Sequence, residues 1–536
     1  MLLLYNIKLP LNHSESELEK AIQKKLGIRA NELLGYSISK RSYDARRKDD
    51  IKLIYSLNVE VRQEKDILRR KRKDNSVRLA PNTNYKYVTQ APDHLSQRPL
   101  VVGTGPCGLF AGLILAQMGF NPIIIERGKR VRERVEDTFG FWRQRKLDTE
   151  SNVQFGEGGA GTFSDGKLHT QIKDKNHRGR KILAEFVKAG APEEILTISK
   201  PHIGTLKLVK IVEKLRNTIQ DLGGEFLFQS RVDDLIIEDG HLQGVILASG
   251  EKLHSEHVIL AIGHSARDTF QMLYQRGVQI EAKPFSMGLR IEHPQSMIDE
   301  CRFGKNAGNP ILGAADYQLV HHSSNGRSVY SFCMCPGGVV LAAASEHGTV
   351  VTNGMSQYSR NAGNANSAIL VEVFPKDYPG SPLAGIDYQR KWEQRAFELG
   401  GGTYDAPGQL VGDFLAGRPS TEFGSVLPSY KPGVHLGDLS TSLPDYIIEA
   451  IREALPVFDK QIRGFVMPNA ILTGVETRSS SPIRIVRGKD FQSVNITGLY
   501  PAGEGSGYAG GILSSAVDGI KVAEAVALNL VEALEI

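Results

Sequence analysis

Cysteine, tryptophan and long apolar runs are scarce in this sequence. Its 536 residues include four cysteines and two tryptophans, which argues against a disulfide-stapled scaffold and favours a reducing compartment. No apolar run approaches the roughly 18 residues that a membrane span needs. The opening residues, MLLLYNIK, lack the basic and long apolar regions of a signal peptide and are typical of a strand instead. We therefore expect a cytoplasmic protein that does not cross a membrane.

The composition excludes disordered and fibrous classes of protein. Hydrophobic residues make up 41% of the chain and charged residues 23%, which is ordinary for a folded globular protein. A chain of this length is too long for one hydrophobic core and long enough for two or three. The sequence therefore predicts several domains.

Positive charge is concentrated near the N-terminus. The formal net charge is +5, but residues 1–95 alone carry +8 and the remainder carries −3. The densest basic runs are 40–48 (KRSYDARRK) and 69–73 (RRKRK). Such runs either form a solvated face or neutralise the phosphates of a nucleic acid. Both interpretations stay open, so RNA is a candidate partner.

The first 95 residues have the pattern of a small α+β domain. A helix is expected over 15–26, with Ser14 as its N-cap, and a strand over 51–61. Prolines and polar residues between 81 and 94 then indicate a linker. Because basic residues flank the expected strand on both sides, we hypothesise that they form one phosphate-binding surface.

A dinucleotide-binding pattern follows the linker. An apolar strand ends in Gly103-x-Gly105-x-x-Gly108, a helix is expected over 109–118, and a second strand ends at Glu126. Gly103 would make the tight turn, Gly105 would let the backbone approach a pyrophosphate, and Gly108 would let the helix pack closely on the strand. The helix N-terminus would face the phosphates, and Glu126 would bind ribose hydroxyls. This ordered series predicts a ligand of the FAD or NAD type.

A second glycine-rich segment lies near the C-terminus. In residues 499–519, LYPAGEGSGYAGGILSSAVDG, a short apolar run breaks into glycines and resumes as an expected helix. Glycine is costly unless the backbone must turn or touch something closely, so this segment forms either a tight turn or a ligand contact. A ligand as long as FAD needs contacts from distant parts of the chain, which favours the ligand contact.

These segments resemble those of the two-dinucleotide-binding-domain flavoproteins, and more closely a bacterial family of FAD-dependent dehydrogenases or NAD(P)/FAD-dependent oxidoreductases. The resemblance covers roughly residues 97–536, and the N-terminal domain is similar to the one that precedes this family's flavin domain. The matching stretches are 103–126, 152–168, 258–267, 331–338, 474–482 and 499–519. The flavoprotein superfamily hosts many chemistries, so the reaction is left open.

The resemblance implies non-covalently bound FAD and a set of cofactor-binding residues. A helix starting near Ile512 would point at the flavin pyrimidine, where its N-terminus stabilises the negative charge of the reduced ring. Residues 156–161 would be a second close approach to the flavin, with a plain glycine loop as the alternative. The implied cofactor-binding residues are Gly103, Gly105, Pro106, Gly108, Glu126, Arg127, Gly158, Gly159, Ser164, Asp165, Lys167, Val232, Gly263, Gly503, Glu504, Gly510, Gly511 and Ile512.

Missing motifs narrow the chemistry. No second Gly-x-Gly-x-x-Gly follows a strand between 270 and 470, and no Cys-x-x-x-x-Cys lies near Gly156, so a disulfide reductase with its own NAD(P)H domain is not expected. Cys333 and Cys335 have a spacing that strains a disulfide and makes a weak metal site, so no metal is expected. These two are either buried structural cysteines or redox-active thiols near the flavin.

The catalytic residues are left open, with three candidates. Alternation would put Arg290 and Glu292 on one face of a strand, where Arg290 either clamps a substrate anion or pairs with Glu292. Arg478, just before a run of serines, would face the flavin or an anionic substrate. Lys167 is the third candidate, as a polar group near the flavin ring.

The sequence predicts an α/β flavoprotein with three parts. A Rossmann-like FAD-binding domain (96–280 and 470–536) would hold an inserted, mainly β substrate domain (281–469), after a small basic α+β domain and its linker (1–95). We expect an FAD-dependent oxidoreductase that acts on an unidentified small molecule by hydride transfer at flavin N5, with NAD(P)H as a candidate transient electron donor. The alternatives are a flavin-dependent RNA-modifying enzyme and a non-enzymatic, redox-switched flavoprotein that binds RNA or a protein.

Overall fold

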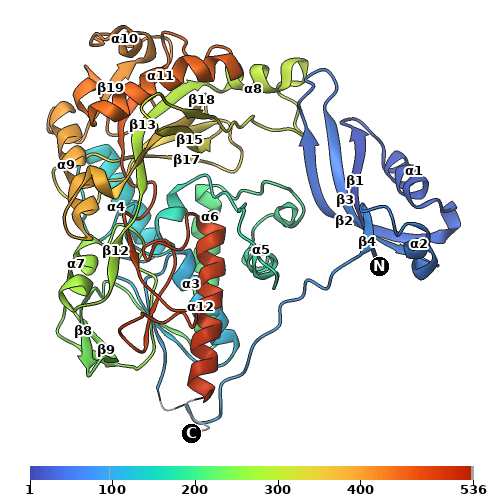
Figure 1. Cartoon of the computed structure of the whole chain (residues 1–536), viewed down its shortest axis with the longest axis horizontal. Coiled ribbons are helices and arrows are strands. Elements are labelled where there is room, and N and C mark those ends of the chain that lie inside the picture. The colour runs from blue at the N-terminus through green and yellow to red at the C-terminus, as the bar shows by residue number, and fades with distance from the viewer. Residues whose placement is uncertain (96, 533–536) are drawn as a thin grey trace.

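The computed structural model describes residues 1–95 and 97–532, so the expected boundary at residue 96 and the last four residues lie outside the described residues. Figure 1 shows a small N-terminal domain beside a larger body, joined to it by an extended segment. The body holds a parallel sheet and a larger mixed sheet. Within the described ranges, no helix is long and apolar enough to cross a membrane.

The N-terminal domain has the split βαββαβ arrangement. Its four strands pair in the order β2-β3-β1-β4, and every pair is antiparallel. The helix expected over 15–26 is present, and the Ser14 side chain accepts from the Glu17 amide in a capping box. The strand β2, the helix α2 and the strand β4 were not expected. The elements are β1 (Leu2–Pro10), α1 (Glu15–Leu26), β2 (Leu33–Asp44), β3 (Lys52–Val61), α2 (Glu64–Arg70) and β4 (Val77–Leu79).

The basic runs 46–48 and 69–73 lie toward different ends of strand β3, and their joint binding of phosphates stays a prediction. Strands β2 and β3 form a hairpin in which Asp44 pairs with Lys52 and Leu33 pairs with Val61. Residues 46–48 therefore lie at one end of the ten-residue strand β3, and 69–73 lie beyond its other end. At about 3.3 Å per residue, the two ends are roughly 30 Å apart.

The FAD-side part of the body is built on a five-stranded parallel sheet, in the order β23-β11-β5-β6-β7. Helix α3 covers the expected region, although it begins earlier, at Pro106. Helix α12 packs directly on α3, because a Cβ on Gly519 would lie 2.2 Å from the Cys107 carbonyl oxygen. The strands are β5 (Leu100–Val102), β6 (Ile123–Ile125), β7 (Glu225–Leu227), β11 (Val258–Leu260) and β23 (Leu499–Pro501); the helices are α3 (Pro106–Gln117), α4 (Val131–Gln144), α5 (Arg178–Lys188), α6 (Thr205–Asp221), α7 (Arg267–Gln275) and α12 (Ile512–Glu532).

Smaller sheets flank this core. An antiparallel sheet follows the order β10-β9-β8, a two-stranded one joins β12 to β22, and a hairpin joins β16 to β17. Their bounds are β8 (Val232–Glu238), β9 (His241–Leu247), β10 (Lys252–His254), β12 (Ile280–Ala282), β16 (Gly338–Ala342), β17 (Thr352–Ser356) and β22 (Ile483–Ile485).

The region expected to form the substrate domain contains a seven-stranded mixed sheet covered by helices, so it is less purely β than expected. Its order is β14-β15-β18-β13-β21-β19-β20. Strand β21 pairs with β13 and β19, so 471–476 lies in this sheet, beyond the expected boundary at 469. The strands are β13 (Phe285–Pro294), β14 (Val320–His322), β15 (Ser328–Cys335), β18 (Asn364–Val373), β19 (Ala406–Leu410), β20 (Val434–Leu436) and β21 (Ile471–Glu476); the helices are α8 (Gln295–Phe303), α9 (Ala384–Leu399), α10 (Val411–Ala416) and α11 (Asp445–Gln461).

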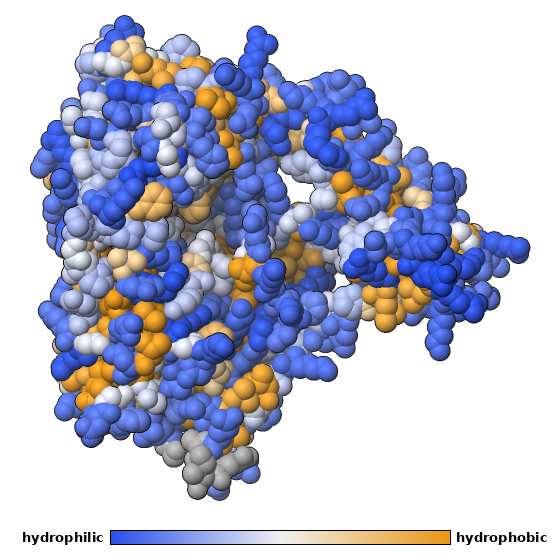
Figure 2. Space-filling view, in the orientation of Figure 1, coloured by the Kyte–Doolittle hydropathy of each residue, from blue (hydrophilic) through white to orange (hydrophobic). Residues whose placement is uncertain are grey.

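The N-terminal domain contacts the body through its β2–β3 hairpin. The Arg41 amide donates to the Thr197 carbonyl over 2.6 Å, and the Ser199 amide donates back to the Arg41 carbonyl over 2.8 Å. At the hairpin tip, the Asn306 side chain donates to the Lys48 carbonyl over 2.9 Å. Figure 2 shows that an opening remains between the domain and the body beside these contacts.

Candidate functional site

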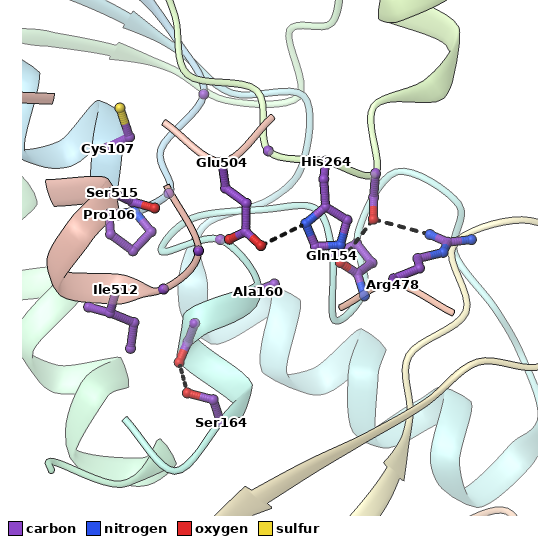
Figure 3. Close-up of a pocket in the computed structure, with 18 of the residues that line it drawn as sticks. Pro106, Cys107, Gln154, Ala160, Ser164, His264, Arg478, Glu504, Ile512 and Ser515 are labelled. Carbon is purple, nitrogen blue, oxygen red and sulfur yellow. Dashed lines mark hydrogen bonds and ion pairs between the residues drawn. The ribbon is translucent and has the colours of Figure 1, made fainter. Parts of the chain in front are cut away.

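A cavity of about 450 Å³ lies at the carboxyl ends of β5, β6, β11 and β23. The carboxyl edge of a parallel sheet is where ligands bind in open α/β folds. Both large sheets of the body contribute to its wall. The loops after the parallel strands line it, and so do residues 331–334 of β15, which belongs to the seven-stranded sheet. Figure 3 shows the part of the wall where the start of α12 approaches the loop after β5. The cavity therefore joins the FAD-side and substrate-side halves of the protein.

The glycines of the first loop have different structural roles. A Cβ on Gly103 would lie 2.4 Å from the Ala261 carbonyl oxygen, and one on Gly108 would lie 1.8 Å from the Gly103 carbonyl oxygen. These two glycines allow close packing, and Gly108 does not line the cavity. Gly105 lines it, has a φ of −66° and would place a Cβ no closer than 3.8 Å to its nearest neighbour, Gly159. Gly105, the N-cap of α3, thus presents bare backbone to the cavity, and the Pro106 ring lies beside it.

Glu126 lies in the cavity wall at the end of β6, with 5% of its surface exposed. One carboxylate oxygen accepts from the Thr104 amide (3.0 Å) and hydroxyl (2.5 Å), and the other accepts from the amides of Gly128 (2.8 Å) and Gly156 (3.1 Å). The carboxylate therefore also ties the loop after β5 to the loop at Gly156.

Arg127 and Val232 line the same region of the wall. The Arg127 guanidinium lies 4.1 Å from the centre of the Phe155 ring and forms ion pairs with Glu150 and Asp268, both at 2.8 Å. The side chain is held by three groups of the protein, so it stiffens the wall around Glu126.

The start of α12 forms the opposite wall, where Gly510, Gly511 and Ile512 all line the cavity. A Cβ on either glycine would have no atom within 4 Å. Glu504 points toward His264, with 3.4 Å between the carboxylate and the imidazole Nδ1 (Figure 3). The His264 Nε2 atom is buried and has no hydrogen-bond partner among the described residues. This wall thus offers open backbone and an unsatisfied ring nitrogen.

Two further glycines of the implied set differ in their positions. Gly263 lines the cavity, and a Cβ there would meet nothing within 4 Å. Gly503 does not line it; its φ is 71°, and its amide donates to Asp518 over 2.8 Å. Gly503 therefore shapes the turn after β23 and does not face a ligand.

The loop over 156–167 brings four implied residues to the cavity, namely Gly159, Ser164, Asp165 and Lys167. Gly158 is not among the lining residues, because a Cβ there would lie 2.2 Å from the Thr162 hydroxyl. Burial raises the pKa of Asp165, but the Arg360 guanidinium, 2.9 Å away, outweighs that effect and holds the pKa below its usual value.

The catalytic candidates do not all reach the cavity. Lys167 and Arg478 line it, whereas Arg290 does not. Lys167 donates to the Met334 carbonyl. Arg478 shares the buried Glu393 with Arg267, at 2.9 and 2.7 Å respectively. Lys167 is thus the lining cation nearest to β15, and Arg478 belongs to a buried ionic network.

Arg290 is fully buried and pairs with Glu476 at 2.6 Å, so the alternative in which it pairs with Glu292 is wrong. Glu292 accepts instead from the Ser429 hydroxyl over 2.6 Å and from Asn364 over 2.9 Å. The Arg290 guanidinium also donates to the Cys333 carbonyl over 3.4 Å. Arg290 therefore supports the cavity wall from behind and is not placed to clamp a substrate.

Sequence reasoning missed several lining residues. Gln154, His264 and Ser265 lie in stretches that carry the family resemblance, and Ser265 donates to Gln154 over 3.0 Å. Position in those stretches is a signal that could have found them. Asn353 and Asp316 also line the cavity, but no local pattern marks them.

The residues present fit FAD. The first amides of a helix have no partner within the helix and attract anions, and both α3 and α12 begin at the cavity. Gly105, Gly263, Gly510 and Gly511 leave space in front of their backbone, and the Glu126 carboxylate suits a ribose. No group of three or more His, Cys, Asp or Glu side chains suited to a metal occurs within residues 1–95 and 97–532.

Comparisons with known proteins agree with this chemistry. Residues 284–479 match a family model described as "FAD-dependent protein, C-terminal domain-like", and residues 1–60 match a domain of unknown function, DUF8436. A short segment of 68 residues is 35% identical to the tRNA uridine 5-carboxymethylaminomethyl modification enzyme MnmG of Lactobacillus acidophilus, over 12% of this chain and 11% of that protein.

Two solved structures match most of this chain at low identity and low TM-score. The L-proline dehydrogenase of P. horikoshii is 12% identical, with a TM-score of 0.37 over 81% of this chain and 94% of that chain. The glycine oxidase of Bacillus cereus is also 12% identical, with a TM-score of 0.32 over 81% of this chain and 96% of that chain.

An uncharacterized protein of Clostridium beijerinckii is 49% identical over 521 residues, which is 97% of both chains. Identity at this level over nearly the whole length defines a common family. The chain therefore belongs to one protein family with this clostridial relative, and its residues 284–479 belong to the FAD-dependent protein C-terminal domain family.

Proposed function

We propose that this protein is an FAD-dependent oxidoreductase that acts on a small molecule by hydride transfer at flavin N5. The observation that carries the proposal is the meeting of two helix N-termini, those of α3 and α12, with open glycine backbone in one cavity. Helix N-termini suit the pyrophosphate of FAD and the negative charge of its reduced ring. When bound, FAD supplies the redox chemistry.

The chain's own residues would have separate tasks. Glu126 and the backbone at Gly105 would hold the adenosine ribose and the pyrophosphate, and the start of α12 would face the flavin ring. Lys167, which is 24% exposed, would supply positive charge on the substrate side. NAD(P)H is a candidate donor that would bind only transiently.

The test is whether the purified full-length protein contains FAD. We expect a yellow protein with a flavin absorption spectrum, from which acid precipitation releases FAD that chromatography identifies. A colourless protein that cannot be loaded with FAD would overturn the proposal.

A flavin-dependent RNA-modifying enzyme is the second candidate, favoured by where the basic N-terminal domain contacts the body. Strand β2 pairs with residues 197–199, and His202, three residues further on, forms a bridge with the cavity residue Lys167. The short match to a tRNA modification enzyme agrees with such a role.

The salt dependence of RNA binding to the full-length protein tests this second candidate. Each neutralised phosphate should contribute about 0.7 to the log–log slope on single strands, and replacing Arg69 to Lys73 by Gln should flatten it. Absence of saturable RNA binding at low salt would remove this candidate.

A further inference from the structure

The cavity wall formed by β15 contains a β-bulge at its two cysteines. Phe332 pairs with Ala368 on β18, and Cys335 pairs with Asn366. Three residue steps on β15 therefore face two steps on β18, and Cys333 has a φ of 44°. An extra residue of this kind bends a strand and redirects its side chains.

The bulge brings the two cysteine backbones closer than a regular strand would. In a regular strand, residues two apart are about 6.6 Å apart, near the upper limit for a disulfide. In the bulge, three residue steps on β15 lie opposite two steps on β18, so the strand is locally contracted and its neighbouring residues are drawn closer together along the strand. The bulge therefore favours approach of the two cysteines more than a regular strand would.

The two thiols have different surroundings. Cys333 is half-buried and lines the cavity, whereas Cys335 is fully buried and its thiol donates to the Cys333 carbonyl over 3.2 Å. Contact with the Cys335 side chain, with help from Lys167 and Arg290, lowers the pKa of Cys333, and the same contact raises the pKa of Cys335. A cavity-lining cysteine with a lowered pKa beside a fully buried cysteine suits an attacking and a resolving thiol.

We propose that Cys333 and Cys335 form a redox-active pair that exchanges with a small-molecule disulfide and passes two electrons to or from the flavin of the cavity. The second half of this statement rests on the proposed function. In the exchange, the Cys333 thiolate attacks the disulfide, one substrate thiolate leaves, and a mixed disulfide forms. The Cys335 sulfur then attacks Cys333, its proton goes to the second leaving thiolate, and an internal disulfide results. Two electrons and a proton returned by reduced flavin would regenerate the Cys333 thiolate and the Cys335 thiol.

The exchange is tested with glutathione disulfide on the reduced, full-length protein, followed by alkylation and trypsin. Both cysteines fall in one tryptic peptide, 328–360. We expect the wild-type peptide to lose two hydrogens and to carry no glutathione, Cys335→Ser to keep glutathione on Cys333, and Cys301→Ser to behave as the wild type. A wild-type peptide that keeps glutathione, or in which both cysteines remain free, would overturn the pair.

A second measurement separates this proposal from the proposed function. The disulfide assay is run on protein with and without FAD, so its result does not depend on the cofactor. In the oxidised, FAD-loaded protein, anaerobic photoreduction of the flavin should release two additional titratable thiols in the wild type and none in Cys333→Ser. If the protein retains FAD but forms no disulfide, only the redox-active cysteine pair is overturned. If the disulfide forms but photoreduction releases no thiols, the electron exchange between the cysteines and the flavin is overturned. If the disulfide forms in a protein that cannot bind FAD, both the proposed oxidoreductase function and the electron exchange with flavin are overturned.

Discussion

The end of the cavity proposed to bind the nucleotide and the end proposed to face the substrate are formed by different kinds of protein groups. The end proposed to bind the nucleotide is formed mainly by the backbone and one carboxylate of the segment 103–126, with Arg127 and Val232 beside them. The substrate end uses the side chains of Lys167, Cys333 and Arg478, which lie far apart in the sequence and are held by other segments. A site formed by the backbone of one segment can therefore be recognised from local sequence. A site formed by side chains from distant segments depends on the tertiary fold.

The largest expected effect is at the nucleotide end, where Gly105→Val should abolish FAD retention. The φ of Gly105 suits any residue and the protein leaves space for a side chain there, so the variant should fold and lose only the ligand contact. Gel filtration followed by an absorption spectrum measures retention. Gly140→Val, in α4 and with open space around it, is the matched control. Normal flavin content in the Gly105 variant would show that the motif is only a turn.

The substrate end should respond to Glu393→Gln with a loss of about 3–5 kcal/mol of stability, because two buried guanidiniums lose their carboxylate. Urea unfolding measures the loss. Glu398→Gln, which removes an exposed pair with Arg395 at 3.0 Å, should cost about 1 kcal/mol or less. Equal losses in the two variants would contradict the role of the buried network.

The same network predicts the pH dependence of stability. Burial raises the pKa of Glu393, but Arg267 and Arg478 outweigh it and hold the pKa far below its usual value. A carboxyl with a depressed pKa contributes stability above its unfolded value, about 4.3, and that stability is lost as the pH falls through the folded value. The difference between wild type and Glu393→Gln should therefore shrink on acidification below about pH 4.

A smaller effect is expected at the nucleotide end for Glu126→Ala, which should weaken FAD binding by about 1–3 kcal/mol through lost hydrogen bonds to the ribose. Because Glu126 also accepts from Thr104, Gly128 and Gly156, the cofactor-free protein should lose stability too. FAD titration by fluorescence and urea unfolding measure the two effects. Glu225→Ala, at an exposed pair with Arg98, is the control. Unchanged affinity would place the ribose contact elsewhere.

The smallest effect is expected from Lys167→Met, which removes a cation that favours the Cys333 thiolate. Alkylation of Cys333 by iodoacetamide should rise with pH because the thiolate reacts, with a wild-type midpoint below the usual thiol value of about 8.5. The variant midpoint should lie higher, and that of the exposed control Lys173→Met should not move. A wild-type midpoint at or above the usual value would contradict the activated thiol.

The elements that sequence reasoning missed share a physical cause. Strand β2 carries two bulges against β3 and is mostly half-exposed, so its alternation of polar and apolar residues is blurred. Strand β13, by contrast, is buried on both faces, and the alternation that placed Arg290 and Glu292 together carried no information about which face meets the cavity.

The sequence by itself determined the capped helix over 15–26, the turn at Gly103 and the presence of the helix after it, although not its start at Pro106, because each depends on backbone geometry within a short segment. Only the tertiary structure decided that Arg290 meets Glu476, that Cys333 opens onto the cavity, and that the two basic runs lie at opposite ends of a strand. These outcomes depend on contacts between segments remote in the chain, and the periodicity of one segment does not encode which distant side chain will lie beside it.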